Sequence, residues 1–155
     1  MSDSLRFSVT EIREAGGLCA SLEVEPALIF PEPVPNAALA GPVAAELEFS
    51  VGGNRILLQL RISGSWKTNC SRCLAEHRVD FAASAEETYP LDQDSVDVGE
   101  EVRQAALLEV PQRSLCRADC KGLCPQCGKD LNAEPCGCVV KPPSPFAALK
   151  KLKGS

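Results

Sequence analysis

Six cysteines fall within 23 residues near the end of the chain, and no other feature limits the possible folds as strongly. Two of them frame the run Cys124-Pro125-Gln126-Cys127-Gly128. A gap of two residues lets both thiolates reach one ion at about 2.3 Å, as in a zinc knuckle. Gly128 can take the positive φ that closes such a turn. The cluster therefore predicts a small zinc-ribbon-like module built from Cys116, Cys120, Cys124, Cys127, Cys136 and Cys138.

A second knuckle-like pair, Cys70 and Cys73, lies far upstream. Eight cysteines can form two four-thiolate sites, so we expect one or two structural Zn²⁺ ions. The preferred pairing places Cys124, Cys127, Cys136 and Cys138 in one site. The other site then holds Cys70, Cys73, Cys116 and Cys120. A single site with several spare thiols is the alternative.

The cysteine content also bears on the compartment. The N-terminus lacks a basic start followed by an apolar run, and no stretch approaches the roughly 20 apolar residues of a membrane span. We expect a soluble, cytoplasmic protein without membrane contact. In a reducing compartment, C-x-x-C pairs bind metal more often than they form disulfides. Cys19 stands alone on an apolar stretch and is expected to pack.

Alternating apolar residues predict an antiparallel sheet. Apolar side chains alternate over 43–51 and 56–62, and Gly52-Gly53-Asn54 between them favours a hairpin turn. Residues 65–70 and 78–89 are expected to form two further strands with Cys70 and Cys73 at their turn. Residues 5–10 and 18–24 are weaker strand candidates. The five prolines of 26–42 favour a loop or linker, and the acidic segment 91–97 is expected to be flexible.

Helices are expected to be few. Asp97 and Glu100 resemble a capping pair for a helix over 98–110, whose apolar face would include Val98, Val102, Ala105, Ala106 and Leu108. Residues 146–153 predict a short basic helix. The fold class expected is thus α+β, a mainly antiparallel β domain with one or two short helices and the zinc-ribbon-like module. Residues 1–110 form the β-rich domain, and residues 111–155 form the cysteine-rich module with its basic tail.

The residues do not favour catalysis. A catalytic zinc usually keeps an open position and often uses His or a carboxylate. The one histidine, His77, is expected to face solvent on a strand rather than to replace a thiolate. The pairs Glu86/Glu87 and Glu100/Glu101 do not resemble an acid–base couple, and no nucleotide-binding or hydrolase motif occurs. A thioredoxin-like pair would open a helix after a strand, which neither pair offers. We expect a binding protein and not an enzyme.

Charge is unevenly distributed. Residues 1–110 carry 8 Lys/Arg and 18 Asp/Glu, whereas residues 111–155 carry 8 and 3. The acidic part would repel a phosphate backbone and suit a basic protein, while the basic part can approach RNA. Basic tails are also commonly plain solvated surface. The candidate phosphate contacts are Arg113, Arg117, Lys121, Lys129, Lys150, Lys151 and Lys153.

The order of these motifs resembles the bacterial YceD family. The resemblance rests on Cys70-Ser71-Arg72-Cys73-Leu74, on the run from Cys120 to Asn132, on Cys136-Gly137-Cys138 and on the ending from Pro143 to Lys150, and it extends over roughly residues 43–153. Family members are named large ribosomal RNA subunit accumulation proteins. The resemblance implies a non-enzymatic role in 23S rRNA processing or accumulation, and so in large-subunit biogenesis. Some members lack most of these cysteines, which implies that zinc is not essential to the shared function.

Two hypotheses follow. In the first, the β domain is a scaffold, and the zinc-bound basic module contacts pre-ribosomal RNA or a large-subunit ribosomal protein. In the second, the chain is a redox- or zinc-responsive regulator whose cysteines release metal on oxidation. A nuclease is the least favoured reading because no carboxylate constellation or open metal site is present.

Overall fold

The computed structural model describes residues 5–139. Its main body is a five-stranded antiparallel sheet made of β2 (Gly17–Val24), β3 (Ala37–Leu39), β4 (Val43–Gly52), β5 (Arg55–Asn69) and β6 (Glu76–Pro90). Strand β5 is central. It pairs with β6 along one side over its whole length, and with β4 and then β3 along the other. Strands β2, β3 and β6 each pair with one neighbour and therefore lie at the edges of the sheet.

The expected hairpin is confirmed. Strands β4 and β5 pair from Ala44↔Ser63 to Gly52↔Arg55, and Gly53 in the turn has φ 59°. The alternating apolar residues of both strands are buried, apart from half-buried Val51. The expected strands at 65–70 and 78–89 belong to a longer pair. Residues 65–69 continue β5 without a break, because the same register with β6 holds from Arg55 to Asn69.

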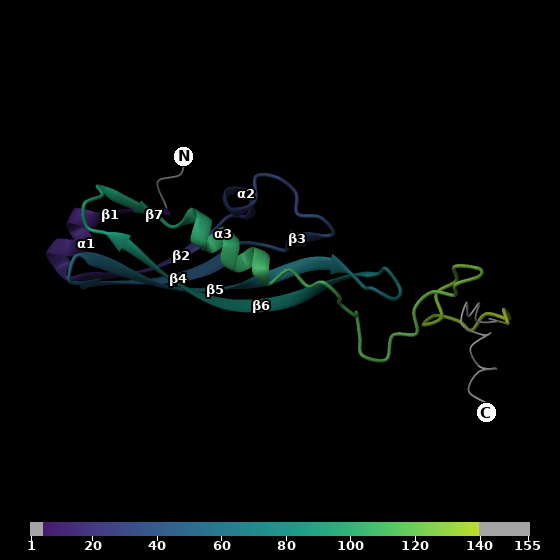
Figure 1. Cartoon of the computed structure of the whole chain (residues 1–155). Coiled ribbons are helices and arrows are strands. Elements are labelled where there is room, and N and C mark those ends of the chain that lie inside the picture. Colours follow the sequence, from purple (N-terminus) through teal and green to yellow (C-terminus); the bar gives the residue numbers. More distant parts are fainter. Residues whose placement is uncertain (1–4, 140–155) are drawn as a thin grey trace, which may run out of the picture.

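Three short helices lie in the described residues: α1 (Val9–Ala15), α2 (Pro26–Ile29) and α3 (Gly99–Leu108). Figure 1 shows α3 and α2 on one side of the long sheet. The core fills the space between, with Trp66, Phe49 and Ile12 among its largest fully buried side chains. Within 5–139, no helix is long and apolar enough to cross a membrane.

Of the two N-terminal strand candidates, the one over 18–24 is confirmed by β2, but the one over 5–10 is confirmed only in part. Only Arg6–Ser8 form a strand, β1, and α1 begins at Val9 where a strand was expected. The Ser8 hydroxyl accepts a hydrogen bond from the Glu11 N–H and caps the helix, so the local signal was a capping motif. Ser95–Asp97, expected to be flexible, form β7, which pairs with β1.

The proline-rich segment 26–42 is also more ordered than expected. It contains α2, with Pro26 in the first turn, and β3, which pairs with β5 from Leu39↔Trp66 to Ala37↔Thr68. Proline is favoured at the first helical position because its missing N–H would have no partner there. The buried side chain of Ile29 anchors the helix to the core.

Helix α3 lies within the range expected. Val98, Val102, Ala105 and Ala106 are buried as predicted, but Leu108 is 84% exposed, so its assignment to the buried face was wrong. The expected capping pair was wrong, because the N-cap residue of α3 is Val98 and has no side-chain cap hydrogen bond; Asp97 precedes it, and its Oδ1 accepts a hydrogen bond from the Gly99 N–H. Cys19, expected to pack, is exposed on β2. The helix expected over 146–153 lies outside the described residues.

Candidate metal centre

Two groups of four cysteines each bring their sulfur atoms within 4.8 Å of one another. The first, termed here the hairpin-tip group, comprises Cys70, Cys73, Cys116 and Cys120. The second, the distal group, comprises Cys124, Cys127, Cys136 and Cys138. These are the two sets that the preferred pairing specifies. Each group can hold a metal ion.

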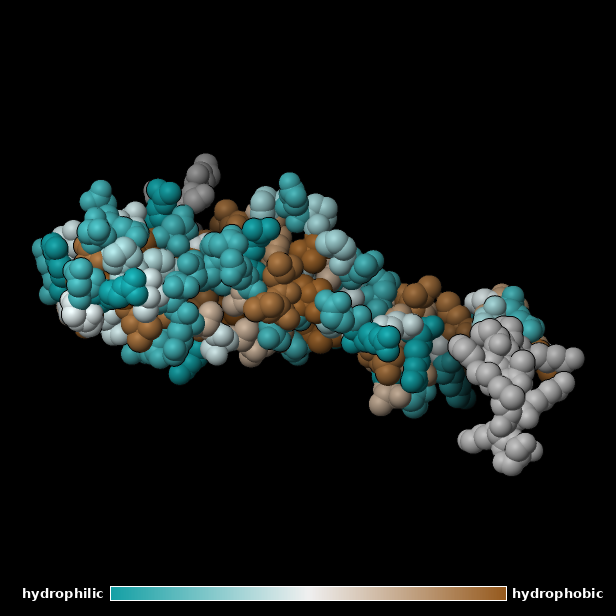
Figure 2. Space-filling model, viewed as in Figure 1, coloured by the Kyte–Doolittle hydropathy of each residue, from teal (hydrophilic) through white to brown (hydrophobic). Residues whose placement is uncertain are grey.

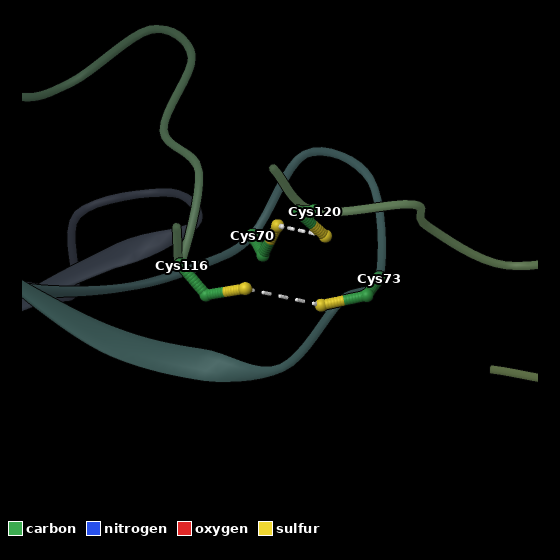
Figure 3. A group of neighbouring side chains, drawn as sticks. All are labelled: Cys70, Cys73, Cys116 and Cys120. Carbon is green, nitrogen blue, oxygen red and sulfur yellow. Dashed lines mark hydrogen bonds between the residues drawn. The ribbon is translucent and has the colours of Figure 1, made fainter. Parts of the chain in front are cut away.

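The hairpin-tip group forms where two distant segments meet (Figure 3). Cys70 and Cys73 lie on the turn between β5 and β6, while Cys116 and Cys120 come from the segment after α3. The sulfur of Cys70 lies 3.7 Å from that of Cys120, and the sulfurs of Cys73 and Cys116 are 3.6 Å apart. Four thiolates about 2.3 Å from a tetrahedral ion stand roughly 3.8 Å from one another. The observed spacing therefore suits one metal ion and is far too long for a disulfide.

The part of the chain from Ser114 to Cys120, termed here the returning segment, is held against the turn by hydrogen bonds. Ser71 N–H donates to the Ser114 carbonyl over 2.7 Å, and Ser114 N–H donates to the Ser71 hydroxyl. Arg72 donates through Nη1 to the carbonyl of Cys120 over 2.8 Å. These contacts place Cys116 and Cys120 beside the first pair through protein groups alone.

The two C-x-x-C turns share one backbone geometry. The N–H of Leu74 donates to the Cys70 carbonyl over 2.9 Å, and the N–H of Cys70 donates to the Ala75 carbonyl over 2.8 Å. The turn at Cys124 and Cys127 repeats this pattern at equivalent positions. The N–H of Gly128 donates to the Cys124 carbonyl, and the N–H of Cys124 donates to the Lys129 carbonyl.

The residue after each second cysteine has a positive φ, +73° at Gly128 and +62° at Leu74. The expectation for Gly128 is confirmed. Leu74 adopts this conformation despite its side chain, which costs roughly 1–3 kcal/mol for a non-glycine residue. Strain of this kind is typical of functional turns, and here it leaves the two thiols of the pair facing the same point.

Backbone N–H groups favour the thiolate form at Cys70. Those of Cys73 and Cys116 lower the pKa of the Cys70 thiol to about 5. The pKa values of the neighbouring thiols of Cys73 and Cys116 are raised instead. The hydrogen bond with the side chain of Cys73, together with partial desolvation, raises the pKa of the Cys116 thiol to about 12. Without a cation, the group thus resists a second negative charge.

The distal group behaves in the same way. The N–H groups of Cys127 and Gln126 lower the pKa of Cys124 to about 6. The side chain of Cys127, followed by burial, raises the pKa of Cys138 to about 12. A divalent cation would supply the charge that lets all four thiols of a group ionise, because metal binding deprotonates coordinating thiols.

His77 lies close to the hairpin-tip group but outside it. Its Nε2 contacts the Ser114 hydroxyl, and its Nδ1 is 3.5 Å from the Ala75 carbonyl. It is partly buried against the returning segment and not simply a solvent-facing strand residue, so that expectation was wrong. His77 thus contacts Ser114, close to Cys116 in the sequence, but contributes no ligand atom to the group.

Asn132 is a site residue to which the sequence analysis assigned no role. Its Nδ2 donates to the sulfur of Cys120 over 3.4 Å, and its Oδ1 accepts from the Lys121 N–H over 2.8 Å. The loop between Cys127 and Cys136 thereby contacts a sulfur of the hairpin-tip group. Its place in the run from Cys120 to Asn132 was a possible signal, but only the folded loop shows that its amide reaches Cys120.

The comparisons with known proteins match parts of the chain. Residues 80–153 match the family model described as "Large ribosomal RNA subunit accumulation protein YceD". The resemblance to the YceD family is therefore confirmed over this segment, which is shorter than the 43–153 expected. It includes the returning segment and both C-terminal cysteine pairs, whereas Cys70 and Cys73 lie before it.

Curated relatives match over similar lengths. An uncharacterized protein of Mycobacterium tuberculosis is 35% identical over 83 residues, which cover 43% of this chain and 40% of that protein. Two plant proteins are named Large ribosomal RNA subunit accumulation protein YCED homolog 1, chloroplastic. The protein from Zea mays is 33% identical over 66 residues (43% of this chain, 22% of that protein). The protein from Arabidopsis thaliana is 32% identical over 50 residues (32% of this chain, 16% of that protein).

The matched part of the chain thus spans less than half the length of these relatives. No solved structure matches the chain.

A substitution at Asn132 tests the hydrogen bond from its side chain to the sulfur of Cys120. In a Cys136→Ser/Cys138→Ser background, which leaves the hairpin-tip group intact, Asn132→Ala should weaken Zn²⁺ binding about tenfold or more, the usual effect of losing a hydrogen bond to a ligand. Competition with a chromogenic chelator measures the affinity. Gln126→Ala is the control, because Gln126 donates to the Val139 carbonyl and not to a sulfur of this group. Equal affinities of the two variants would contradict the assigned contact.

Proposed function

We propose that this chain is a non-enzymatic factor that supports 23S rRNA accumulation or processing, and thereby large-subunit biogenesis, in the cytoplasm. The match of residues 80–153 to the YceD family model is the observation that carries the proposal. The names of the two plant relatives agree with it, since they describe accumulation of large-subunit ribosomal RNA. The family name describes an accumulation factor and no reaction.

We further propose that each group of cysteines holds one structural Zn²⁺. Four thiolates and no histidine or carboxylate form a closed coordination shell, which is typical of structural zinc and leaves no position for a reacting water. Such an ion fixes loops that would otherwise have no core. In the proposed organisation, residues 1–110 are the β-rich domain, and residues 111–155 are a module joined to it through the hairpin-tip group.

The zinc content provides a direct test. Native mass spectrometry of the purified chain should show two Zn²⁺ ions. Cys70→Ser and Cys124→Ser should each reduce the number to one, because each removes a ligand from a different group. Cys19→Ser is the matched control and should leave both ions bound, since Cys19 is exposed on β2 outside both groups. One ion in the unaltered chain, or loss of zinc from the control, would contradict the two-site assignment.

The alternative function is a redox- or zinc-responsive regulator. The observation that favours it is exposure, because Cys116 and Cys127 are exposed to solvent, one in each group. Accessible thiolates are the ones that oxidants reach first. Reversible zinc release at modest peroxide, with a change in partner binding, would support this function. Zinc held tightly under those conditions would end it.

The proposed partner is pre-ribosomal RNA or a large-subunit ribosomal protein, and the basic tail supplies a test of ribosomal association. Charge reversal at Lys150, Lys151 and Lys153 should weaken co-sedimentation with large-subunit precursors, because attraction to a phosphate backbone depends on positive charge. Gradient centrifugation of lysates, with immunodetection of the chain, gives the measurement. The triple Lys→Arg variant preserves the charge and should sediment as the unaltered chain does. Unchanged sedimentation of the reversed variant would remove the tail from the proposed contact.

A further inference from the structure

A groove of about 460 Å³ follows the outer edge of strand β6 beneath the end of helix α3. It is lined by six consecutive residues of β6, Ala82 to Glu87, and by side chains of α3 and the residue after it. Successive side chains of a strand point to opposite faces of the sheet. A groove lined by six residues in a row must therefore run along the edge of the strand rather than over one face.

This edge is available for hydrogen bonding. Strand β6 pairs only with β5, and the backbone groups of residues 82–87 have no other partner within the described part of the chain. Four of the lining residues of β6 have small side chains, Ala82, Ala83, Ser84 and Ala85. An extended backbone can approach such an edge closely and add to the sheet as a further strand.

The charged side chains that line the groove are all negative. Glu86, Glu87, Glu101 and Glu109 line it, and among residues 5–139 no lysine or arginine does. Within residues 5–139, none of the four carboxylates takes part in a salt bridge. The Oε2 atom of Glu101 is buried without a hydrogen-bond partner there, while Oε1 accepts from the Tyr89 hydroxyl. A buried carboxylate oxygen without a donor is costly, so it adds to the uncompensated negative charge beside the groove.

An apolar contact lies beside these charges. Leu108 lines the groove and is 84% exposed, and its neighbour Leu107 is also exposed. Figure 2 shows a hydrophobic area at the C-terminal end of α3, bordered by hydrophilic residues. The groove thus combines a free strand edge, four carboxylates without a salt bridge among the described residues, and one exposed leucine.

We propose that this groove binds an extended, lysine- or arginine-rich protein segment as an additional strand next to β6. Basic side chains of the segment would reach the exposed carboxylates of Glu87 and Glu109, and an apolar side chain would cover Leu108. The inference rests on the proposed function for the source of the segment, a ribosomal protein, whose binding to RNA requires such basic residues. RNA does not fit the groove, because its phosphates would meet four carboxylates.

Peptide binding to the purified full-length chain tests the proposal without reference to rRNA levels. The probe is a fluorescein-labelled peptide of about ten alternating lysine and valine residues, long enough to pair with the exposed edge. The comparison peptide has proline in place of each valine, which preserves the charge but removes N–H groups and strand-forming capacity. Fluorescence anisotropy at physiological ionic strength should show binding of the first peptide and at least about tenfold weaker binding of the second.

Two variants locate the binding site. Glu87→Gln/Glu109→Gln should weaken binding about tenfold, since each exposed ion pair contributes up to about fivefold to a binding constant. Leu108→Ser should weaken it about fivefold through lost apolar contact. Glu14→Gln/Glu23→Gln removes the same charge from exposed positions on α1 and β2 and should change binding by less than about twofold. All of these side chains are exposed, so circular dichroism should report an unchanged fold.

Equal binding of the valine and proline peptides, or equal losses in the two double variants, would overturn the proposal in favour of unspecific charge attraction. Absence of binding would overturn it as well. A labelled single-stranded RNA that binds the unaltered chain and is displaced by the lysine–valine peptide would assign the groove to RNA instead. None of these outcomes alters the ribosomal association measured by sedimentation, so failure here is distinguishable from failure of the proposed function.

Discussion

The pairing of β5 with β6 over fifteen residues is the interaction on which the rest of the structure depends. It runs without interruption from Arg55↔Pro90 to Asn69↔Glu76. Its inner face carries buried side chains such as Trp66 and Leu60, and its turn carries Cys70 and Cys73 away from the core (Figure 1). Because the two strands are paired along their whole length, the turn between them is held in place where the later cysteines meet it. The outer edge of β6 leaves a groove beside α3.

The segment after α3 depends on other forces. Between residues 111 and 139, the only buried side chains are those of Cys120 and Cys124, so this part has no hydrophobic core. Hydrogen bonds link it to the hairpin turn, for example from the Leu123 N–H to the Arg72 carbonyl over 3.2 Å. Such contacts each contribute only about 0.5–1.5 kcal/mol. Metal–thiolate bonds would add far more, which is the physical basis for proposing zinc in both groups.

Much of this arrangement could be predicted from local patterns. The alternation in β4 and β5 predicted a hairpin because one face must be buried, and the C-x-x-C spacing predicted knuckle turns. What failed depended on contacts distant in sequence. Residues 95–97 form a strand only because Arg6–Ser8 lie opposite them. The positive φ at Leu74 and the contact from Asn132 to Cys120 had no signal as distinct as Gly128, since neither residue type requires such a role. The ligand pairing was one of several possibilities until the fold brought segments more than 40 residues apart together.

The account joins a rigid β scaffold, a cysteine-rich module and an acidic groove into one proposed role in large-subunit biogenesis. Its central claim is most directly tested by depleting the chain in its own cells and measuring 23S rRNA against 16S rRNA. The account predicts that mature 23S rRNA falls relative to 16S rRNA and recovers when the unaltered chain is restored. An unchanged ratio on full depletion would contradict the proposed function, whatever the metal content of the purified chain.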